Sequence, residues 1–364
     1  MRILDKYILK KYLTSFVFVL LILIPVIIAI NLAEKVDKFL RHPDLTAGTI
    51  IKDYYVNFIV NIGNMILPLA LFVSVLFFTS KLAENTEIIA ISNAKISFKR
   101  FLKPYFIGAT IITLFSLVLN HFIVPNSSKI YEEFDNTYIK NKPKDYSRLQ
   151  NVNIQLSENE YIYIKDYSLK RNSGTNFCYE KYDGIKLKEK LLADNIRFIE
   201  TDSTSIFKLT NLYKRKIIND GDDIISYQRK LDTLFNFKPE DLLHVDAFAK
   251  EMQTPELLSY IKKSKARGRG SLNAYLVELY KRTSLPMSSY ILTLIAVALG
   301  SVKRRGGVGV NLTIGVILMF IYVFLLKIVE VLGASADASP LFLVWLPNII
   351  FGAVAVYLYM KARK

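Results

Sequence analysis

The stretch Ser80–Pro104 reads SKLAENTEIIAISNAKISFKRFLKP and lies between two apolar runs that are long enough to cross a membrane. Apolar residues such as Leu82, Ile88 and Ile91 are mixed with charged ones such as Glu84 at helical spacing. A connection between two membrane helices needs only a turn, so this pattern predicts a short amphipathic helix at the membrane surface. Such a helix is a surface that a soluble partner can bind. We therefore expect the membrane helices to be driven from outside the chain through this segment.

The whole chain has the composition of a polytopic membrane protein. Of its 364 residues 52% are hydrophobic, and these residues gather in blocks of roughly 20, the length that crosses a bilayer as a helix. We place six spans at about 12–33, 54–80, 104–124, 283–302, 308–330 and 341–360. The first block is longer than the apolar region of a signal peptide, and no small-residue cleavage site follows it, so we interpret it as a span.

Basic residues at the span ends predict the orientation, because Lys and Arg in short loops favour the cytoplasmic side. With six spans, four basic groups fall on one side of the membrane. They are Arg2, Lys6, Lys10 and Lys11; Lys81, Lys95, Lys99, Arg100 and Lys103; Lys303, Arg304 and Arg305; and Lys361, Arg363 and Lys364. We expect this side to be the cytoplasm, with both termini inside. The net charge of +16 then reflects membrane orientation and lipid contact rather than nucleic acid.

The long insert between the third and fourth spans has the pattern of β-strands. Segments such as Asn153–Leu156, Tyr161–Ile164 and Ser205–Leu209 alternate between apolar and polar residues, and polar clusters such as Asn172–Thr175 separate them. Short alternating strands with polar turns predict an antiparallel sandwich or an open barrel. With six spans, this domain lies on the side opposite the termini.

The predicted fold class is an α-helical polytopic membrane protein with six transmembrane helices and an inserted all-β domain. We expect three spans in residues 1–124, including a surface helix over 81–97; the β domain in 125–254; and a linker helix with three spans in 255–364.

Motifs that carry catalysis are missing from the sequence. It has no phosphate-binding G-x-x-x-x-G-K-[ST] motif and no G-x-S-x-G motif. The histidines His42, His121 and His244 are far apart, without metal-ligand spacing. Cys178 is the single cysteine, which excludes an internal disulfide or a cysteine metal cluster. We expect no enzymatic active site, no ATPase site in this chain, no cofactor and no metal.

Charged residues near the span ends are candidates for contact with an anionic lipid. Glu34, Lys35, Asp37, Lys38 and Arg41 follow the first span at helical spacing. Charges at a membrane rim suggest function, but snorkelling and pairing along the helix explain them equally well.

A second charged group lies in the C-terminal half. Glu278, Lys281 and Arg282 enter the fourth span, and Lys327 and Glu330 lie near the end of the fifth. Such a group can orient a helix or contact a head-group phosphate, and both interpretations stay open.

Four segments carry a resemblance to a known family. They are LDKYILKKYL, PLALFVSVLFFTSKLAENTEIIAISNAKISFKR, ELYKRTSLPMSSYILTLIAVAL and PLFLVWLPNIIFGAVAVYL. These segments, and the order of three spans, a β domain and three spans, resemble the LptF/LptG lipopolysaccharide-export permeases. The resemblance covers nearly the whole chain and is more specific in the spans than in the β domain.

The resemblance implies the permease subunit of an ABC transporter in the bacterial inner membrane. Two such permeases pair around a cavity and bind a cytoplasmic ABC ATPase dimer. They extract lipopolysaccharide and pass it, through periplasmic jellyroll-like domains, to a periplasmic bridge protein of similar domains.

The resemblance also implies roles for individual residues. The segment Glu84–Asn93 matches the family's coupling helix, and the positions expected to contact the ATPase are Glu84, Glu87, Ile88, Ala90, Ile91, Ser92 and Asn93. Val36 and Asp37 match a pair in the first span of the LptG branch, where lysines face lipid phosphates. Arg41 keeps one basic position, whereas Glu34 stands where another would be. The expected head-group contacts are Lys35, Lys38, Arg41, Lys281 and Arg282.

Two other functions are considered. One is a membrane-anchored scaffold whose β domain binds a periplasmic partner without transport. The other, a secondary transporter, would require mid-span acidic residues and repeat symmetry, and neither is evident. The branch of the family, the chemistry of the lipid, the identity of the partner permease and the strand order are left open.

Overall fold

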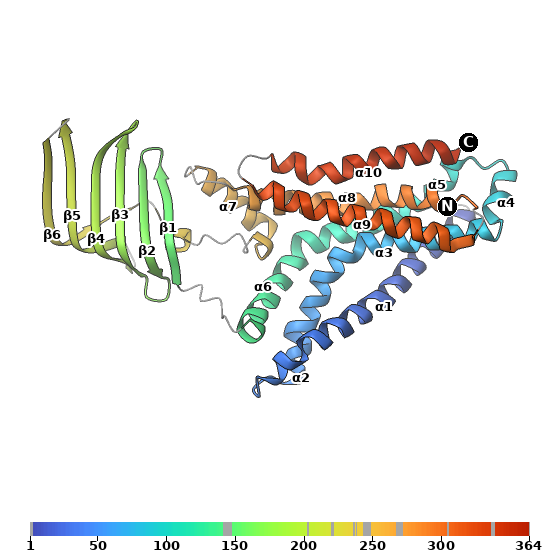
Figure 1. Cartoon of the computed structure of the whole chain (residues 1–364), viewed down its shortest axis with the longest axis horizontal. Coiled ribbons are helices and arrows are strands. Elements are labelled where there is room, and N and C mark those ends of the chain that lie inside the picture. Colours follow the sequence, from blue (N-terminus) through green and yellow to red (C-terminus); the bar gives the residue numbers. More distant parts are fainter. Residues whose placement is uncertain are drawn as a thin grey trace. The chain divides into compact units, whose positions relative to one another are not determined.

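A computed structural model of the chain describes residues 3–140, 148–201, 204–219, 222–235, 237, 239–242, 249–266, 272–303, 306–335 and 339–363. The chain divides into two compact units (Figure 1). The helical unit comprises residues 1–141, 247–258 and 273–364, and the sheet unit comprises residues 142–246 and 259–272.

Six helical segments of the helical unit are long and apolar enough to cross a membrane. They are Ile3–Leu40, Ala47–Glu84, Phe98–Ile139, Asn273–Gly300, Gly307–Ala334 and Pro340–Ala362. The prediction of six spans is therefore confirmed. The first three segments extend past the apolar blocks that predicted them at both ends, where polar residues such as Lys6, Lys52 and Lys99 continue the backbone hydrogen bonding.

The individual helices are bounded as follows. In chain order they are α1 Ile3–Leu40, α2 Ala47–Thr49, η1 Ile50–Tyr55, α3 Val56–Glu84, α4 Glu87–Asn93, α5 Phe98–Val118, η2 Leu119–Ile123, α6 Val124–Phe134, η3 Asp135–Ile139, α8 Asn273–Gly300, α9 Gly307–Ala334 and α10 Pro340–Arg363. The segments η1, η2 and η3 are π-helical turns. They continue the second and third spans without a break.

The core of the helical unit forms around α8, which packs against α3, α5, α9 and α10. In its apolar window 72% of the residues are buried, against 6% in α1, the least buried span. A side chain at Gly315 of α9 would collide with Leu76 of α3, so the missing side chain allows these two helices to approach closely. Most of the apolar surface of α1 is left for lipid or for another protein.

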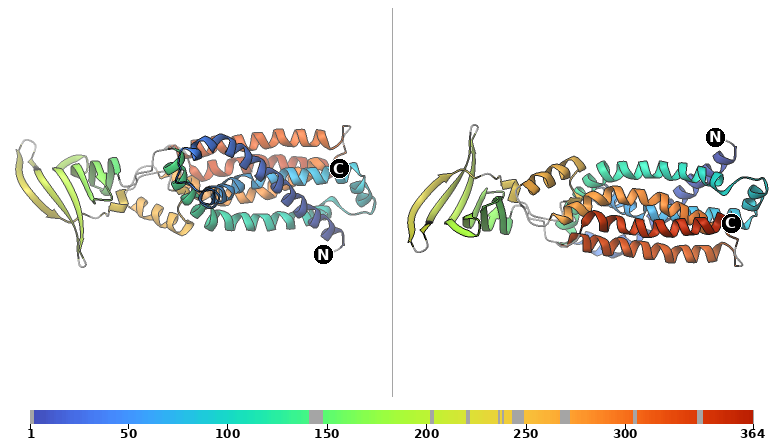
Figure 2. Two further views of the ribbon diagram at one scale, coloured as in Figure 1. Left: turned by 90° about the horizontal axis from the view of Figure 1, so that it is seen from below. Right: turned by 90° about the horizontal axis from the view of Figure 1, so that it is seen from above.

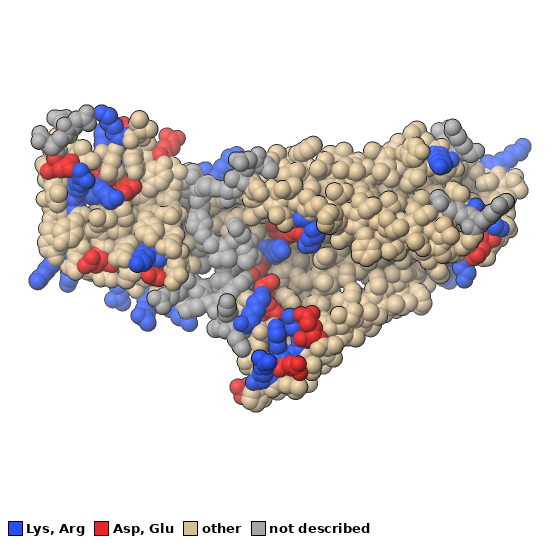
Figure 3. Space-filling view, in the orientation of Figure 1, with Lys and Arg blue, Asp and Glu red and all other residues tan. Residues whose placement is uncertain are grey.

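Both chain termini lie at one end of the helical unit (Figure 2), and α4 lies at the same end (Figure 1). We call this the terminal end. Charged side chains of the helical unit gather at its ends, and most of the surface between them carries none (Figure 3). This distribution is the one that a bilayer requires, because a charge within hydrocarbon is costly.

The sheet unit contains one antiparallel sheet in which every strand pairs with its neighbour in the sequence. The strands are β1 Arg148–Ser157, β2 Glu160–Ser168, β3 Ser173–Asp183, β4 Lys186–Thr201, β5 Thr204–Asn219 and β6 Asp222–Thr233. The 3₁₀ turn η4, Pro239–Leu242, follows, and helix α7, Thr254–Ala266, begins in the helical unit and continues into the sheet unit. The inserted all-β domain is therefore confirmed.

A single apolar face forms the core of the sheet. Ile164 of β2 lies opposite Phe177 of β3, and both side chains are buried. The chain after β6 returns over this face, where the ring of Phe237 stacks on that of Phe207 with centroids 4.4 Å apart. The sequence predicted a sandwich or an open barrel, whereas in the described residues this returning segment covers the face that a second sheet would cover.

Candidate functional site

The connection between α3 and α5 forms an elbow at the terminal end, which we define as residues 85–97. Helix α3 ends at Glu84, and Thr86 has a left-handed backbone with a φ of 60°. β-Branched residues rarely adopt this conformation, and it interrupts the helical hydrogen bonding. The helix expected over 81–97 is therefore divided, with Lys81–Glu84 completing α3 and α4 starting at Glu87.

Helix α4 is amphipathic in the way that its sequence predicts. Ile88 and Ile91, three residues apart, pack against the main core of the helical unit. The outward face consists of Ile89, Ala90, Ser92 and Asn93, all exposed. Ile89 is 49% exposed, and an apolar side chain on such a face suits a partner's groove. Six of the seven expected coupling residues, all except Glu84, thus lie on this short helix, and three of them, Ala90, Ser92 and Asn93, face outward.

The two acidic residues expected in the coupling helix contact other elements of the terminal end. The Tyr7 hydroxyl of α1 donates a hydrogen bond to Oε2 of Glu87, at 2.9 Å. The backbone carbonyl of Glu84 accepts one from Nζ of Lys303, at 3.3 Å. The elbow is therefore connected to α1 through Glu87, and the end of α3 is connected to the chain after α8 through Glu84.

A further contact joins α1 to the other side of the elbow. Ser97 caps α5, its Oγ accepting from the backbone N–H of Arg100 at 3.3 Å. Arg100 forms two hydrogen bonds with Asp5 of α1, of 2.7 and 2.8 Å. Asp5 is only 3% exposed. The start of α1 thus contacts both α4 and α5.

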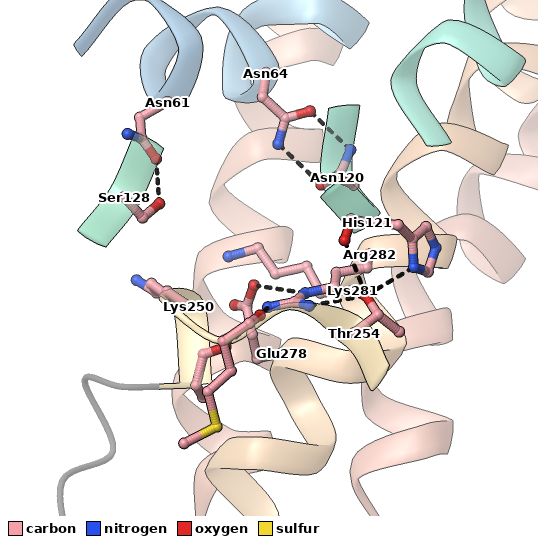
Figure 4. A network of polar contacts seen from close by, with 12 residues as sticks. Asn61, Asn64, Asn120, His121, Ser128, Lys250, Thr254, Glu278, Lys281 and Arg282 are labelled. Atoms are coloured by element: carbon pink, nitrogen blue, oxygen red, sulfur yellow. Dashed lines mark hydrogen bonds and ion pairs between the residues drawn. The ribbon is translucent and has the colours of Figure 1, made fainter. Parts of the chain in front are cut away.

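A pocket of about 220 Å³ lies between helices of the helical unit. Its apolar lining comes from α3, α6, α8, α9 and α10. Its polar lining is Asn61, Asn64, Asn120, Ser128, Lys250, Glu278, Lys281, Ser284, Lys327 and Glu330. Figure 4 draws seven of these residues, which come from segments far apart in the sequence: Asn61, Asn64, Asn120, Ser128, Lys250, Glu278 and Lys281. The sequence predicts a role for the charged members of α8 and α9 but not for Lys250 or the amides.

Three lysines surround the Glu330 carboxylate. Nζ of Lys281 is 2.8 Å from Oε1, Nζ of Lys327 is 3.0 Å from Oε2, and Nζ of Lys250 is 3.9 Å from Oε1. Glu278 also lines the pocket, so two carboxylates face three ammonium groups and one positive charge is left over. The cluster can therefore take a further anion at little electrostatic cost.

Amide side chains form the opposite wall of the pocket. Asn64 and Asn120 exchange two hydrogen bonds of 2.9 and 2.7 Å, and Ser128 donates to Asn61. Polar groups inside apolar spans are a known signal of function, and this signal could have identified them. Their pairing joins α3 to η2 and α6.

Arg282 lies next to the pocket but is not among the described residues that line it. Its side chain is 2% exposed. Nη2 donates to the carbonyls of Ala249 and Met252, both at 2.8 Å, and Nη1 donates to Oγ1 of Thr254 at 2.9 Å (Figure 4). Nε lies 3.6 Å from the carboxylate of Glu278. With its donors engaged in this way, the guanidinium holds residues 249–254 against α8 rather than facing the pocket.

Of the other expected head-group residues, Lys35 and Lys38 lie on the last turns of α1, and Arg41 directly follows the helix. Lys35 and Lys38 are half-buried and Arg41 is exposed. Nζ of Lys35 is 3.1 Å from Glu34. Among the contacts of the described residues, no hydrogen bond or ion pair joins this group to Lys281. The expected basic residues therefore form two separate groups, one at the end of α1 and one that includes Lys281 at the pocket.

Comparison with known proteins identifies a family. Residues 6–361 match the family described as lipopolysaccharide export system permease LptF/LptG. The match includes both units. A comparison with individual curated proteins finds no match.

Proposed function

Because this chain belongs to the LptF/LptG family of lipopolysaccharide export permeases, we propose that it converts force applied at its elbow into extraction of lipopolysaccharide from the inner membrane. The family and the six apolar helices make it a multi-pass inner-membrane permease subunit. We also propose an energy source, lipid contacts and partners for this subunit.

The energy has to come from another protein. Removing a lipid from a bilayer costs about 0.8 kcal/mol for each methylene group that leaves the hydrocarbon, and lipopolysaccharide has several acyl chains. The sequence has no phosphate-binding G-x-x-x-x-G-K-[ST] motif. We propose that a cytoplasmic ABC ATPase dimer supplies the force, which places the terminal end and both termini in the cytoplasm and the sheet unit in the periplasm.

The observation that carries this proposal is the connection of the elbow to α1. The outward face of α4 is exposed. Glu87 of α4 contacts Tyr7 of α1, and Arg100 in the first turn of α5 contacts Asp5 of α1. The apolar window of α1 is the least buried among the spans, although Ile8, Tyr12 and Phe16 near its start pack in the core. Few contacts therefore oppose movement of the later part of this helix. A push on α4 is thereby transmitted to the span that can move most easily.

We propose that the pocket and the end of α1 hold the phosphates of the lipid head group. Lys281, Lys327 and Lys250 provide the first set of cations, and Lys35, Lys38 and Arg41 provide the second. The contacts of Arg282 argue for a positioning role instead. A second permease of the family would cover the exposed apolar faces of the spans, and a periplasmic bridge protein would receive the lipid from the sheet unit.

Copurification tests the proposal. A tagged chain, expressed with the ABC ATPase of its own cell, should retain that ATPase, and the substitution Ile89→Asp should abolish retention because it places a charge on the outward face of α4. Ile185→Asp is the matched control, since Ile185 is 98% exposed in a turn of the sheet unit. Retention by the Ile89→Asp chain would contradict the role of the elbow. Purification of the unaltered chain without any ATPase would favour the scaffold function.

A further inference from the structure

A groove of about 480 Å³ lies on the outside of the helical unit, at the terminal end. It is separate from the pocket and from α4. Its lining consists of Lys99, Leu102, Lys103, Phe106, Ile107 and Thr110 of α5, Leu294 of α8 and Tyr359 of α10. The six α5 residues recur at intervals that place them on one face of the helix.

Two lysine ammonium groups lie at the mouth of the groove. Lys99 and Lys103 are exposed and lie one turn apart at the start of α5. Neither makes a hydrogen bond or ion pair with another described residue. Arg100, between them in sequence, is engaged by Asp5. Two adjacent ammonium groups at a membrane surface attract an anionic head group.

The rest of the groove is apolar. Thr110 lies seven residues beyond Lys103, which is about 10 Å along the helix and within the hydrocarbon. Phe106 and Ile107 line the part between, and the Phe106 ring stacks on Tyr290. The Thr110 hydroxyl already donates to the Phe106 carbonyl and accepts from Tyr290. This part therefore offers an acyl chain an apolar wall without an unsatisfied polar group.

We propose that the groove binds one anionic phospholipid of the leaflet at the terminal end. Its phosphate lies between Lys99 and Lys103, and one acyl chain runs along Phe106 and Ile107 towards Thr110. The charge at the mouth selects an acidic head group, and the apolar wall requires a tail. This site is distinct from the pocket proposed for lipopolysaccharide and does not depend on that function.

Lipid binding to the purified full-length chain tests the head-group contact. Phosphatidylglycerol and phosphatidylcholine would be titrated into the detergent-solubilised protein and bound lipid counted by native mass spectrometry. Lys99→Gln with Lys103→Gln should weaken phosphatidylglycerol binding by roughly 25-fold, about fivefold for each lysine, and leave phosphatidylcholine unchanged. The control, Lys6→Gln with Lys10→Gln, removes the same charge from exposed positions of α1 at the same end. The proposal would be overturned if the two double variants lost phosphatidylglycerol binding equally, or if Lys99→Gln with Lys103→Gln lost none.

A second variant and a soluble competitor test the tail. Ile107→Trp fills the groove without a change in charge, and it should reduce phosphatidylglycerol binding at least fivefold while Lys99 and Lys103 stay intact. Glycerol 1-phosphate, which has the phosphate but no acyl chain, should not displace the lipid at equal concentration. Unchanged binding by Ile107→Trp, or displacement by glycerol 1-phosphate, would show a surface phosphate site and overturn the proposal.

Discussion

Asp5 and Arg100 form a two-pronged ion pair in which Nη1 lies 2.7 Å from Oδ1 and Nη2 lies 2.8 Å from Oδ2. The pair joins the first turn of α1 to the first turn of α5, directly after the elbow. Paired hydrogen bonds of this kind fix orientation as well as distance, because both groups are planar. The pair therefore couples the start of α1 to the start of α5, next to the elbow.

We expect Asp5→Asn to uncouple ATP hydrolysis from lipid release. The amide keeps the shape of the carboxylate, but it loses the charge and one acceptor, so Arg100 is held less firmly. The unfolding free energy should fall by about 1–2 kcal/mol, with the ATPase still bound. Reconstituted vesicles that contain the complete export complex would report lipopolysaccharide release per ATP hydrolysed.

The exchanged pair, Asp5→Arg with Arg100→Asp, provides the control for this prediction. It should recover part of the release that Asp5→Asn loses, because the attraction between α1 and α5 returns. Normal release per ATP by Asp5→Asn would show that the ion pair does not transmit the movement of the elbow.

Gly315→Ala should destabilise the helical unit, by about 1–3 kcal/mol, because the added methyl group meets Leu76 of α3 and overpacks the core. Gly309→Ala is the matched change on the same helix, since no atom lies within 4 Å of the position that its Cβ would occupy. The second substitution should leave stability unchanged or raise it, because Ala favours a helix over Gly. Thermal unfolding in detergent compares the two variants. Equal melting temperatures would contradict the close approach of α9 to α3.

Lys281→Gln and Lys327→Gln should each lower crosslinking of lipopolysaccharide to a photoreactive group placed in the pocket. Each change removes one of the three ammonium groups near Glu330, so the pocket attracts the head group less. Lys208→Gln on β5 is a control that leaves the pocket intact. If all three variants crosslink as well as the unaltered chain, the pocket lysines do not bind the head group.

The spans and the sheet were predictable because their signals are local. An apolar block of about 20 residues has few alternatives to a membrane helix, and the spacing of Ile88 and Ile91 alone indicates the inward face of α4. The break at Thr86 was not predictable, since Thr ordinarily avoids a left-handed backbone. Contacts between residues that are far apart in the sequence were not predictable either. Asn64 pairs with Asn120 only because α3 lies beside η2, and nothing in the local sequence shows that Arg282 contacts residues 249–254.

Acid should weaken the sheet unit through Glu180 on β3. Its hydrogen bond from Lys190 of β4, at 2.7 Å, lowers the pKa of the Glu180 carboxyl in the folded chain. A pKa that is lower in the folded than in the unfolded state stabilises the fold above the unfolded value, about 4.3, and this contribution is lost as pH falls through the folded pKa. Glu180→Gln should therefore reduce the loss of hydrogen-exchange protection in β3 and β4 between pH 6 and pH 3. If the Glu180→Gln chain lost hydrogen-exchange protection over the same pH range as the unaltered chain, the Glu180 carboxylate would not be the group that stabilises these strands.

Arg282→Lys should destabilise the helical unit, although the substitution keeps the positive charge. Arg282 uses separate nitrogens for the carbonyls of Ala249 and Met252 and for Thr254, and an ammonium group on a flexible stem cannot reproduce this geometry. Breaking a buried charged network typically costs about 3–5 kcal/mol, so we expect a lower melting temperature and faster hydrogen exchange at residues 249–254. Thr254→Val removes one partner and leaves the guanidinium in place, so its effect should be smaller. If exchange at 249–254 in the Arg282→Lys chain matched that of the unaltered protein, Arg282 would not be the residue that holds this segment against α8.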